Sequence, residues 1–352
     1  MKCYLVSYFG ISNAGGVERV CYYIKTIMES KNYEIVVVDK SRIENYWMGK
    51  LLKLILGRIP LLIVGMVSSL FVLQKKKRGD ILITNGFNCP YVHADILFIH
   101  GTMAGYGKAL GTKYTWKTKI PLLFETAAVK RARHIVAVSH NAIDEVKKFY
   151  TDKLSDARVL NNMVNDTIFF PIPSERNTLG IIYCGRLDFG KGYTKLKNLC
   201  DYIDANHIPA KVYIAANNSH NSEVFAMNKC VEINIRLDIN QLNEFYNRGD
   251  VMFFPSMYEG FEMVTLEALS AGIPVLGNSV GAVGELTSRN EPGVDIIKEP
   301  DNPELIIKQL SSLADKFKGM DSRQKLHQYY KQNYGVAAYV NRLNTILTNI
   351  NM

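Results

Sequence analysis

The chain has 352 residues, of which 47% are hydrophobic and 21% charged, and its net charge is +9. These values exclude a disordered or fibrous chain and indicate a globular protein with enough apolar residues for two hydrophobic cores. The charge is uneven, because residues 1–170 contain 24 Lys and Arg against 13 Asp and Glu, whereas residues 171–352 contain 18 against 20. The first half is therefore expected to face something anionic: nucleic acid, a phospholipid surface or a phosphorylated acceptor.

Cysteine usage and the N-terminus both favour a cytoplasmic protein. The six cysteines form no C-x-x-C pair, and several lie in apolar stretches, as isolated buried thiols in a reducing compartment do. The chain starts with a short strand pattern that leads into a glycine turn, and no long apolar stretch follows Lys2. This start is not typical of a secretory signal peptide.

Short apolar runs bounded by turn residues predict buried β-strands through the first half. These runs are residues 3–8, 33–38, 80–86, 95–100 and 132–139. The first run leads to Gly15 and Gly16 and then to a helical pattern, and a strand, a glycine turn and a helix start can bind phosphate. The fourth run ends at His100, at the end of a strand where α/β sheets place ligands.

Residues 51–73 form a long apolar segment, which Lys53, Arg58 and Pro60 interrupt and four basic residues at 75–78 follow. The uncharged part, residues 59–73, is shorter than the roughly 18–20 residues that a spanning helix needs. Two interpretations stay open: a buried helix of the first domain, or an element that lies on an anionic membrane with its basic residues at the headgroups. One helix could also serve both purposes.

The second half repeats the pattern of strands and helices. Strands are predicted at residues 181–184, 211–215, 231–236 and 251–254, and helices at 303–317 and 322–350. Arg186 and Lys191 lie five residues apart in the turn after the first of these strands. Two fixed cations there could stabilise the negative charge of a phosphate group.

Two glutamates flank a predicted helix start after the strand at 251–254. Glu259 lies in the turn and Glu267 lies eight residues later, about one turn into a helix that ends near Gly272. Unpaired N–H groups at a helix start bind anions, and carboxylates accept hydrogen bonds from sugar hydroxyls. Together they suit a sugar nucleotide.

The stretch from Phe253 to Val275 resembles the E-x7-E motif of retaining glycosyltransferases with the GT-B fold, of the family 4 or group 1 type. Gly15-Gly16-Val17-Glu18-Arg19 and Gly185-Arg186 with Lys191-Gly192 are similar to two further motifs of that family. The resemblance implies an α/β fold with two Rossmann-like domains that face each other across a cleft. The implied boundaries are 1–172 for an acceptor-binding domain, 173–335 for a nucleotide-sugar-binding domain and 336–352 for a helix that packs back on the first domain.

The resemblance also implies site residues. The expected catalytic residues are Glu259, His100, Arg186 and Lys191. The expected donor-binding residues are Gly15, Gly16, Arg186, Lys191, Arg236, Leu237, Glu259, Phe261, Glu262, Met263, Val264, Thr265 and Glu267. Within this set Glu259 and the backbone of residues 261–263 would hold the sugar, Val264 and Thr265 the diphosphate, and Glu267 the ribose. Glu262 departs from the family, which often has Gly or Pro there.

The implied reaction is the transfer of a sugar from a nucleotide sugar, expected to be a UDP-sugar, to a glycan hydroxyl in the synthesis of a surface polysaccharide or lipopolysaccharide. No cofactor or metal is expected, because no Asp-x-Asp motif is placed for a sugar nucleotide. The expected partners are the donor, a glycan or lipid-linked acceptor and an anionic membrane at the inner face of the plasma membrane. A sugar-nucleotide epimerase of the same fold is the alternative. A nucleic-acid-binding protein is the weakest hypothesis, because no recognition module is present.

Overall fold

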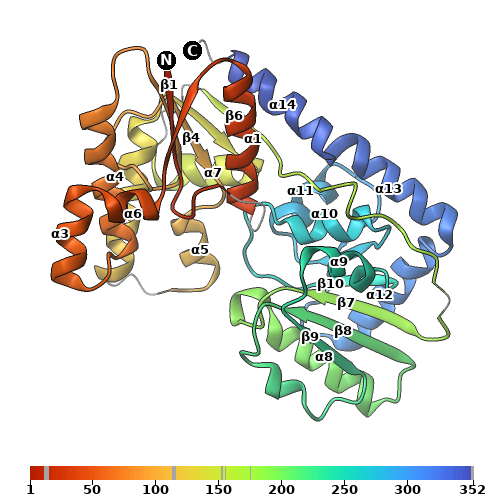
Figure 1. Cartoon of the computed structure of the whole chain (residues 1–352). Coiled ribbons are helices and arrows are strands. Elements are labelled where there is room, and N and C mark those ends of the chain that lie inside the picture. The colour runs from red at the N-terminus through yellow and green to blue at the C-terminus, as the bar shows by residue number, and fades with distance from the viewer. Residues whose placement is uncertain (12–15, 113–115, 152–153, 155, 175, 350–352) are drawn as a thin grey trace. The chain divides into compact units, whose positions relative to one another are not determined.

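A computed structural model of the chain describes residues 1–11, 16–112, 116–151, 154, 156–174 and 176–349 (Figure 1). The chain divides into two compact units, of which the first comprises Met1–Asn162 with Val340–Met352 and the second Met163–Tyr339. The units are divided after residues 162 and 339, whereas the predicted domain boundaries were residues 172 and 335. Each unit contains one parallel sheet with helices around it, so each is described by itself.

The sheet of the first unit has the strand order β2-β1-β3-β4-β5-β6, and every pair of neighbours is parallel. The strands are β1 (Lys2–Val6), β2 (Glu34–Val38), β3 (Ile81–Asn85), β4 (Ile96–Ile99), β5 (His134–Ala137) and β6 (Ala157–Val159). The helices are α1 (Gly16–Ser30), α2 (Lys40–Asn45), α3 (Trp47–Leu56), α4 (Leu61–Lys75), α5 (Met103–Ala109), α6 (Trp116–Arg131) and α7 (His140–Phe149). Strands β3 and β4 are buried along their whole length, as continuous apolar runs in parallel sheets are.

The sheet of the second unit has the order β12-β11-β10-β7-β8-β9 and is also parallel. Its strands are β7 (Leu179–Cys184), β8 (Ala210–Ala216), β9 (Val231–Ile235), β10 (Val251–Phe254), β11 (Val275–Gly277) and β12 (Val294–Ile296). The helical elements are η1 (Phe189–Lys191), α8 (Tyr193–Ala205), η2 (Ser222–Phe225), α9 (Ile239–Tyr246), α10 (Met263–Ser270), α11 (Gly281–Ser288), α12 (Pro303–Lys316) and α13 (Met320–Tyr334). The last helix, α14 (Val336–Asn349), starts in the second unit, and from Val340 on it belongs to the first. Together the two sheets confirm the predicted α/β fold class.

Each sheet has a point where the strand order reverses direction. In the first unit this point lies between β1 and β3, and in the second between β7 and β10. Loops that leave two neighbouring strands there diverge to opposite faces of the sheet, and the crevice between them is where such sheets bind ligands. The predicted motifs fall on these loops: Gly16 starts α1 after β1, Arg186 and Lys191 follow β7, and Glu259 follows β10.

The apolar segment at residues 51–73 is not one helix. The chain breaks between Gly57 and Pro60, because Gly57 ends α3 and Pro60 precedes the first residue of α4. Helix α4 buries seven residues in the first unit, which confirms a buried helix for this part of the segment. Helix α3 buries only Gly49 and leaves Leu54 84% exposed, and its contact with a membrane stays a prediction. In the described parts of the chain, none of the helices combines the length and the apolar character that a membrane crossing requires.

All six cysteines are buried and unpaired, as the sequence predicted. Burial raises the pKa of the Cys3 and Cys89 thiols to about 12, so these side chains stay neutral and serve as small core residues.

Candidate functional site

The two loops at the reversal point of the second sheet are tied together through their backbones. The N–H of Met257 donates to the carbonyl of Gly190 at 2.8 Å. Gly192 has a φ of 72°, and a Cβ on it would lie only 2.1 Å from the carbonyl oxygen of Pro255, so the position requires glycine. The turn after β7 therefore packs directly on the turn after β10.

This packing brings Lys191 to Glu259, which lies 68 positions later in the sequence. The ammonium group of Lys191 forms an ion pair with Oε1 of Glu259, and the same oxygen accepts a hydrogen bond from the hydroxyl of Ser256 at 2.7 Å. Both charged side chains are largely buried, with 20% and 11% of their surface exposed. An ammonium group has three donors, so Lys191 can bind a further oxygen ligand while it holds Glu259.

Arg186 reaches the same loop through Asp188. Its Nε donates to Oδ2 of Asp188 at 2.6 Å, and Oδ1 of Asp188 accepts from the backbone N–H of Lys191 at 3.0 Å. Asp188 thus fixes both predicted cations relative to each other. Because more than half of the Arg186 side chain is exposed, it is accessible to an anionic ligand.

Glu262 lies immediately before α10 and touches two helices. Its Oε1 accepts from the hydroxyl of Thr265 at 2.5 Å, and its Oε2 accepts from the backbone N–H of Ala282 at 2.9 Å. Burial, and after it the charge of Glu259, raises the pKa of Glu262 to about 7. The residue that departs from the family motif is therefore a carboxyl group that titrates near neutral pH.

The other predicted residues of α10 and its turn differ in accessibility. Phe261 is buried and stacks on Tyr334, with 6.3 Å between the ring centroids, so only its backbone can face a ligand. Met263 and Val264 are half-buried in the first turn of α10, and Thr265 is fully buried. Glu267 is 4% exposed and accepts from the hydroxyl of Tyr246 at 3.1 Å.

Arg236 and Leu237 follow β9, two strands away from β7 in the sheet. Arg236 is exposed and has a φ of 59°, and its N–H donates to the carbonyl of Ala216 at 2.9 Å. The hydrogen bonds and ion pairs of the described residues do not join Arg236 or Leu237 to Lys191 or Glu259, so their role as base contacts stays a prediction.

In the first sheet, Asn85 lies at the end of β3, at the reversal point, and His100 follows the neighbouring strand β4. Gly16 is the first residue of α1, while Gly15 lies outside the described residues. Nδ2 of Asn85 donates to the carbonyl of Val6 at 3.1 Å, so its Oδ1 faces Nε2 of His100 at 2.9 Å. This assignment puts the ring proton of His100 on Nε2 and leaves Nδ1 as an acceptor. Burial lowers the pKa of His100 to about 4, so the ring is neutral.

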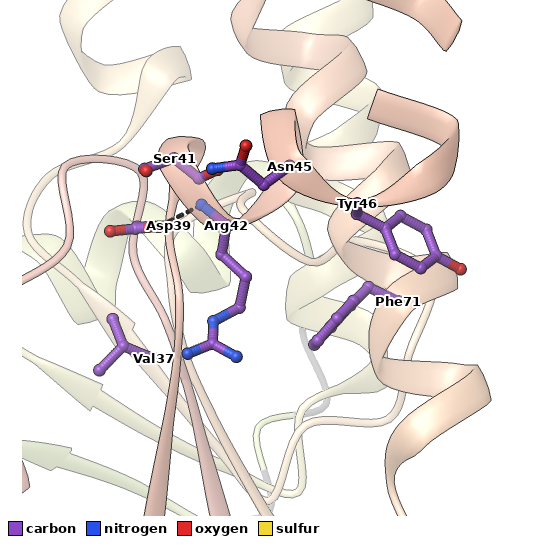
Figure 2. A pocket seen from close by; sticks show the side chains of 7 residues that line it. All are labelled: Val37, Asp39, Ser41, Arg42, Asn45, Tyr46 and Phe71. Atoms are coloured by element: carbon purple, nitrogen blue, oxygen red, sulfur yellow. Dashed lines mark hydrogen bonds between the residues drawn. The ribbon is translucent and has the colours of Figure 1, made fainter. Parts of the chain in front are cut away.

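The first unit also contains a pocket of about 530 Å³, which the sequence did not predict (Figure 2). It lies after β2 and is lined by Val37, Asp39, Ser41, Arg42, Asn45, Tyr46 and Phe71. Asp39 accepts from the backbone N–H of Arg42 at 2.7 Å, whereas the guanidinium group of Arg42 extends away from Asp39, towards Val37 and Phe71. Aromatic rings beside hydroxyl, amide and guanidinium groups form a surface that suits a sugar.

Several residues that shape the site were missed. Asp188 links Arg186 to Lys191, and Ser256 donates to Glu259. Asn278, after β11, donates to the carbonyls of Pro255 and Ser256 at 3.1 and 3.0 Å. Asp188 could have been found from its place between the two cations, but nothing local distinguishes Asn278.

No group of three or more His, Cys, Asp or Glu side chains in the described ranges is arranged as a metal site. The metal independence of the reaction stays a prediction.

A family model matches much of the second unit. Residues 178–316 match the family described as glycosyl transferases group 1. The match includes Arg186, Lys191, Glu259 and Glu267, and it covers less than half of the chain.

Among curated proteins, the chain is similar to an uncharacterized glycosyltransferase of Methanocaldococcus jannaschii, with 27% identity over 62% of this chain and 58% of the relative. It is also similar to glycogen synthase of Mycobacterium tuberculosis, with 24% identity over 48% of this chain and 43% of the relative. The chain therefore spans only about half the length of these relatives.

Solved structures cover nearly the whole chain. Sucrose-phosphate synthase of Thermosynechococcus elongatus has a TM-score of 0.76 at 15% identity, over 99% of this chain and 98% of that structure. WaaG, a glycosyltransferase involved in lipopolysaccharide biosynthesis, has a TM-score of 0.69 at 14% identity, over 98% and 99%. At these identities the likeness concerns the fold. The chain has the GT-B fold, and its second unit contains a domain similar to the group 1 glycosyl transferases.

Proposed function

We propose that the protein is a retaining glycosyltransferase that transfers a sugar from a nucleotide sugar, expected to be a UDP-sugar, to a hydroxyl of a glycan acceptor. The observation that carries the proposal is the ion pair of Lys191 with Glu259, beside Arg186, at the reversal point of a sheet that matches the group 1 family. A cation for the diphosphate and a carboxylate for sugar hydroxyls lie in contact there, as transfer from such a donor requires.

The chemistry follows from where charge develops. When the bond between the sugar and the diphosphate breaks, negative charge grows on the leaving phosphate. Arg186 and Lys191 stabilise this charge, and Asp188 holds them in place before the reaction starts. Because two cations are present at this loop, the proposed reaction needs no divalent ion. Glu259 orients the sugar, Glu267 binds the ribose, and His100 accepts a hydrogen bond from the sugar through Nδ1.

The acceptor is proposed to belong to a surface polysaccharide or a lipopolysaccharide. Two similar proteins support this class: WaaG is involved in lipopolysaccharide biosynthesis, and an uncharacterized 41.2 kDa protein of the cps region of Klebsiella pneumoniae is 25% identical over 51% of this chain. The pocket beside Arg42 and Tyr46 in the first unit offers a surface for one of the acceptor's sugars.

A peripheral contact with an anionic membrane is part of the proposal. Trp47, Leu54 and Ile55 of α3 are 55–84% exposed. The hydroxyl of Tyr46 contacts Gln74, which places the start of α3 beside the end of α4, where Lys75, Lys77 and Arg78 are exposed. Apolar side chains beside basic ones are typical of an element that lies on a membrane of anionic lipid.

The donor is tested by a thermal-shift screen of nucleotide sugars, since a bound ligand stabilises the fold. Incubation of the best ligand with a lipid-linked glycan, followed by proton NMR of the product, then gives the anomeric configuration, and EDTA tests the metal independence. Transfer with retention in EDTA is expected. An epimerised sugar nucleotide and no transfer would instead favour the epimerase.

The membrane contact is tested by flotation with vesicles of phosphatidylglycerol and phosphatidylcholine. Changing Lys75, Lys77 and Arg78 to Gln is expected to reduce co-flotation several-fold, because each basic residue near the surface contributes about 1 kcal/mol. Lys308→Gln with Lys325→Gln, two exposed lysines of the second unit, is the matched control. Equal flotation of all variants would refute the contact.

A further inference from the structure

Glu262 lies where the first turns of α10 and α11 meet. It precedes α10 without capping it, and its Oε2 accepts from the N–H of Ala282, the second residue of α11. The N-terminus of a helix carries partial positive charge and favours anions. The carboxylate of Glu262 thus occupies a place where two helix starts favour a negative charge.

The start of α11 is fitted closely to this carboxylate. Gly281 has a φ of 53°, and a Cβ on it would lie 2.1 Å from Oε2 of Glu262 and 2.4 Å from Cβ of Glu259. The backbone of α11 can therefore approach both glutamates only because residue 281 is glycine. The same fit confines the two acidic side chains to one small region.

The groups that face Glu262 do not neutralise it. Glu259 comes from the turn after β10 and is paired with Lys191 of η1. Helix α10 contributes the hydroxyl of Thr265, and α11 contributes the N–H of Ala282. The hydrogen bonds of Thr265 and of the backbone lower the pKa of this carboxyl, but its burial and the charge of Glu259 outweigh them and raise it to about 7.

A nucleoside diphosphate at the first turn of α10 would bring further negative charge to this carboxyl. The hydroxyl of Thr265 is fully buried in the free protein and already donates to the carboxylate of Glu262. The ionised carboxylate and a diphosphate would therefore both need the positive ends of α10 and α11. Like charges in contact favour the protonated form of a carboxyl group. A proton on Oε1 would remove this repulsion and could be donated to Oγ1 of Thr265.

We propose that the donor's diphosphate and the ionised carboxylate of Glu262 compete for the helix starts of α10 and α11, so that nucleotide binding adds one proton from the buffer to Glu262. The inference rests on the proposed function, because it requires a nucleoside diphosphate at α10. Glu262, which stands where the family usually has Gly or Pro, would then have a role in donor binding. A side chain with a purely structural role would not take up a proton when the nucleotide binds.

The test is isothermal titration calorimetry of the intact protein with the nucleoside diphosphate that stabilises it best among UDP, GDP and ADP. Titrations at pH 8 in two buffers with different ionisation enthalpies give the number of protons taken up. We expect about half a proton per nucleotide for the wild type at pH 8, because the carboxyl is mostly ionised in the free protein and would be about half protonated once the diphosphate lies beside it. The terminal phosphate, with a pKa of about 6, is already ionised at this pH.

Glu262→Gln is the decisive variant. Its amide can accept from Ala282 and donate to Thr265, so the contacts and the fold are kept while the charge is removed. We expect almost no proton uptake and an affinity that stays constant from pH 7 to 8.5, whereas the wild-type affinity falls several-fold. Glu291→Gln is the control, because Glu291 is also a largely buried carboxyl with a raised pKa. It contacts the hydroxyl of Tyr334 and the guanidinium group of Arg289, whereas Glu262 contacts the first turns of α10 and α11.

The outcomes separate two failures. Binding with equal proton uptake in the wild type and in Glu262→Gln would overturn the coupling and leave the proposed function standing. If none of the three nucleotides binds, the proposed function fails, and the coupling fails with it.

Discussion

The reversal points of the two sheets have the same topology and opposite electrostatics. In the second unit the loops carry fixed charges, with Lys191 paired to Glu259 and Arg186 held by Asp188. In the first unit the ends of β3 and β4 carry neutral groups, because His100 has a pKa of about 4 and is bound by the amide of Asn85. In the proposed reaction the charged loops would stabilise the leaving phosphate, and His100 would bind a neutral hydroxyl group.

The difference fits the two parts of a nucleotide sugar. The diphosphate gains negative charge during transfer and needs fixed cations, whereas the hydroxyls of the sugar stay neutral and need directed hydrogen bonds. A neutral His100 with its acceptor on Nδ1 can bind a hydroxyl without attracting phosphate. Removing a charge from the second unit and adding one to the first should therefore change the transfer rate by different amounts.

The largest effect is expected from Lys191→Met. It removes a cation from the leaving phosphate and leaves the largely buried Glu259 without its ion pair. We expect kcat/KM to fall by about 10²–10³-fold, as loss of a preorganised group at a developing charge does. The measurement is the rate of donor-sugar transfer, together with the affinity for the nucleoside diphosphate.

Lys195→Met is the matched control for this change. Lys195 lies one turn later, in α8, and pairs with Asp301, whose side chain is 83% exposed. Exposed ion pairs contribute little, so the rate should stay within about twofold of the wild type. Equal losses in both variants would mean that Lys191 acts only through the stability of the fold.

A smaller effect is expected from Asn85→Asp. A carboxylate beside Nε2 favours the protonated ring, so the pKa of His100 should rise from about 4 towards neutral pH. The charged ring has no acceptor on Nδ1, and activity should then be lost as the pH falls below the new pKa. The wild type should show no such loss down to about pH 5, because its histidine stays neutral there.

The pH dependence of kcat/KM measures this change, and Asn85→Ala separates its two causes. Removal of the amide loosens the ring without adding charge, so we expect a pH-independent loss of about tenfold, since one buried hydrogen bond contributes about 1 kcal/mol. If Asn85→Asp and Asn85→Ala had the same pH profile, His100 would not contact the substrate through Nδ1.

How much of this site could be predicted depends on how local each signal is. The glycines and charges after β7 and β10 mark strand-end loops, so Arg186, Lys191 and Glu259 were found from the sequence. That β7 and β10 are neighbours is a property of the sheet, and the ion pair across 68 positions depends on it. The close contact of α11 with Glu262 depends on packing between helices. The sequence around Gly281 contains no pattern that predicts this contact.

The same reasoning explains the apolar segment at residues 51–73. Its composition predicted that it would be buried or would lie on a membrane, and Gly57 and Pro60 divide it into two helices. Helix α4 confirms the buried alternative, whereas the membrane contact stays a prediction. Those two residues were visible signals of a break. Which of the two helices would face the core could not be read from them, because α3 and α4 are both strongly apolar.

The last prediction concerns Glu125, a buried acid that contacts the loop after His100. Its raised pKa can be compared with that of Glu262. Glu125 of α6 is 2% exposed, and it accepts from the N–H of Met103 at 2.8 Å and from the hydroxyl of Tyr150. Burial raises its pKa from 4.5 to about 7. It binds the loop after His100 through Met103, and it is protonated below about pH 7.

The folded protein holds a proton on Glu125 between about pH 4.5 and 7, where the unfolded chain has lost it, so stability should fall as the pH rises through this window. Glu125→Gln keeps both hydrogen bonds without a charge. Relative to the wild type it should gain about 1–3 kcal/mol of unfolding free energy between pH 5 and pH 8, measured by urea denaturation. Glu29→Gln, at an exposed pair with Lys25, is the control and should gain nothing. A wild type whose stability relative to Glu125→Gln does not change with pH would mean that Glu125 is ionised in the fold, and that a charge does lie behind His100.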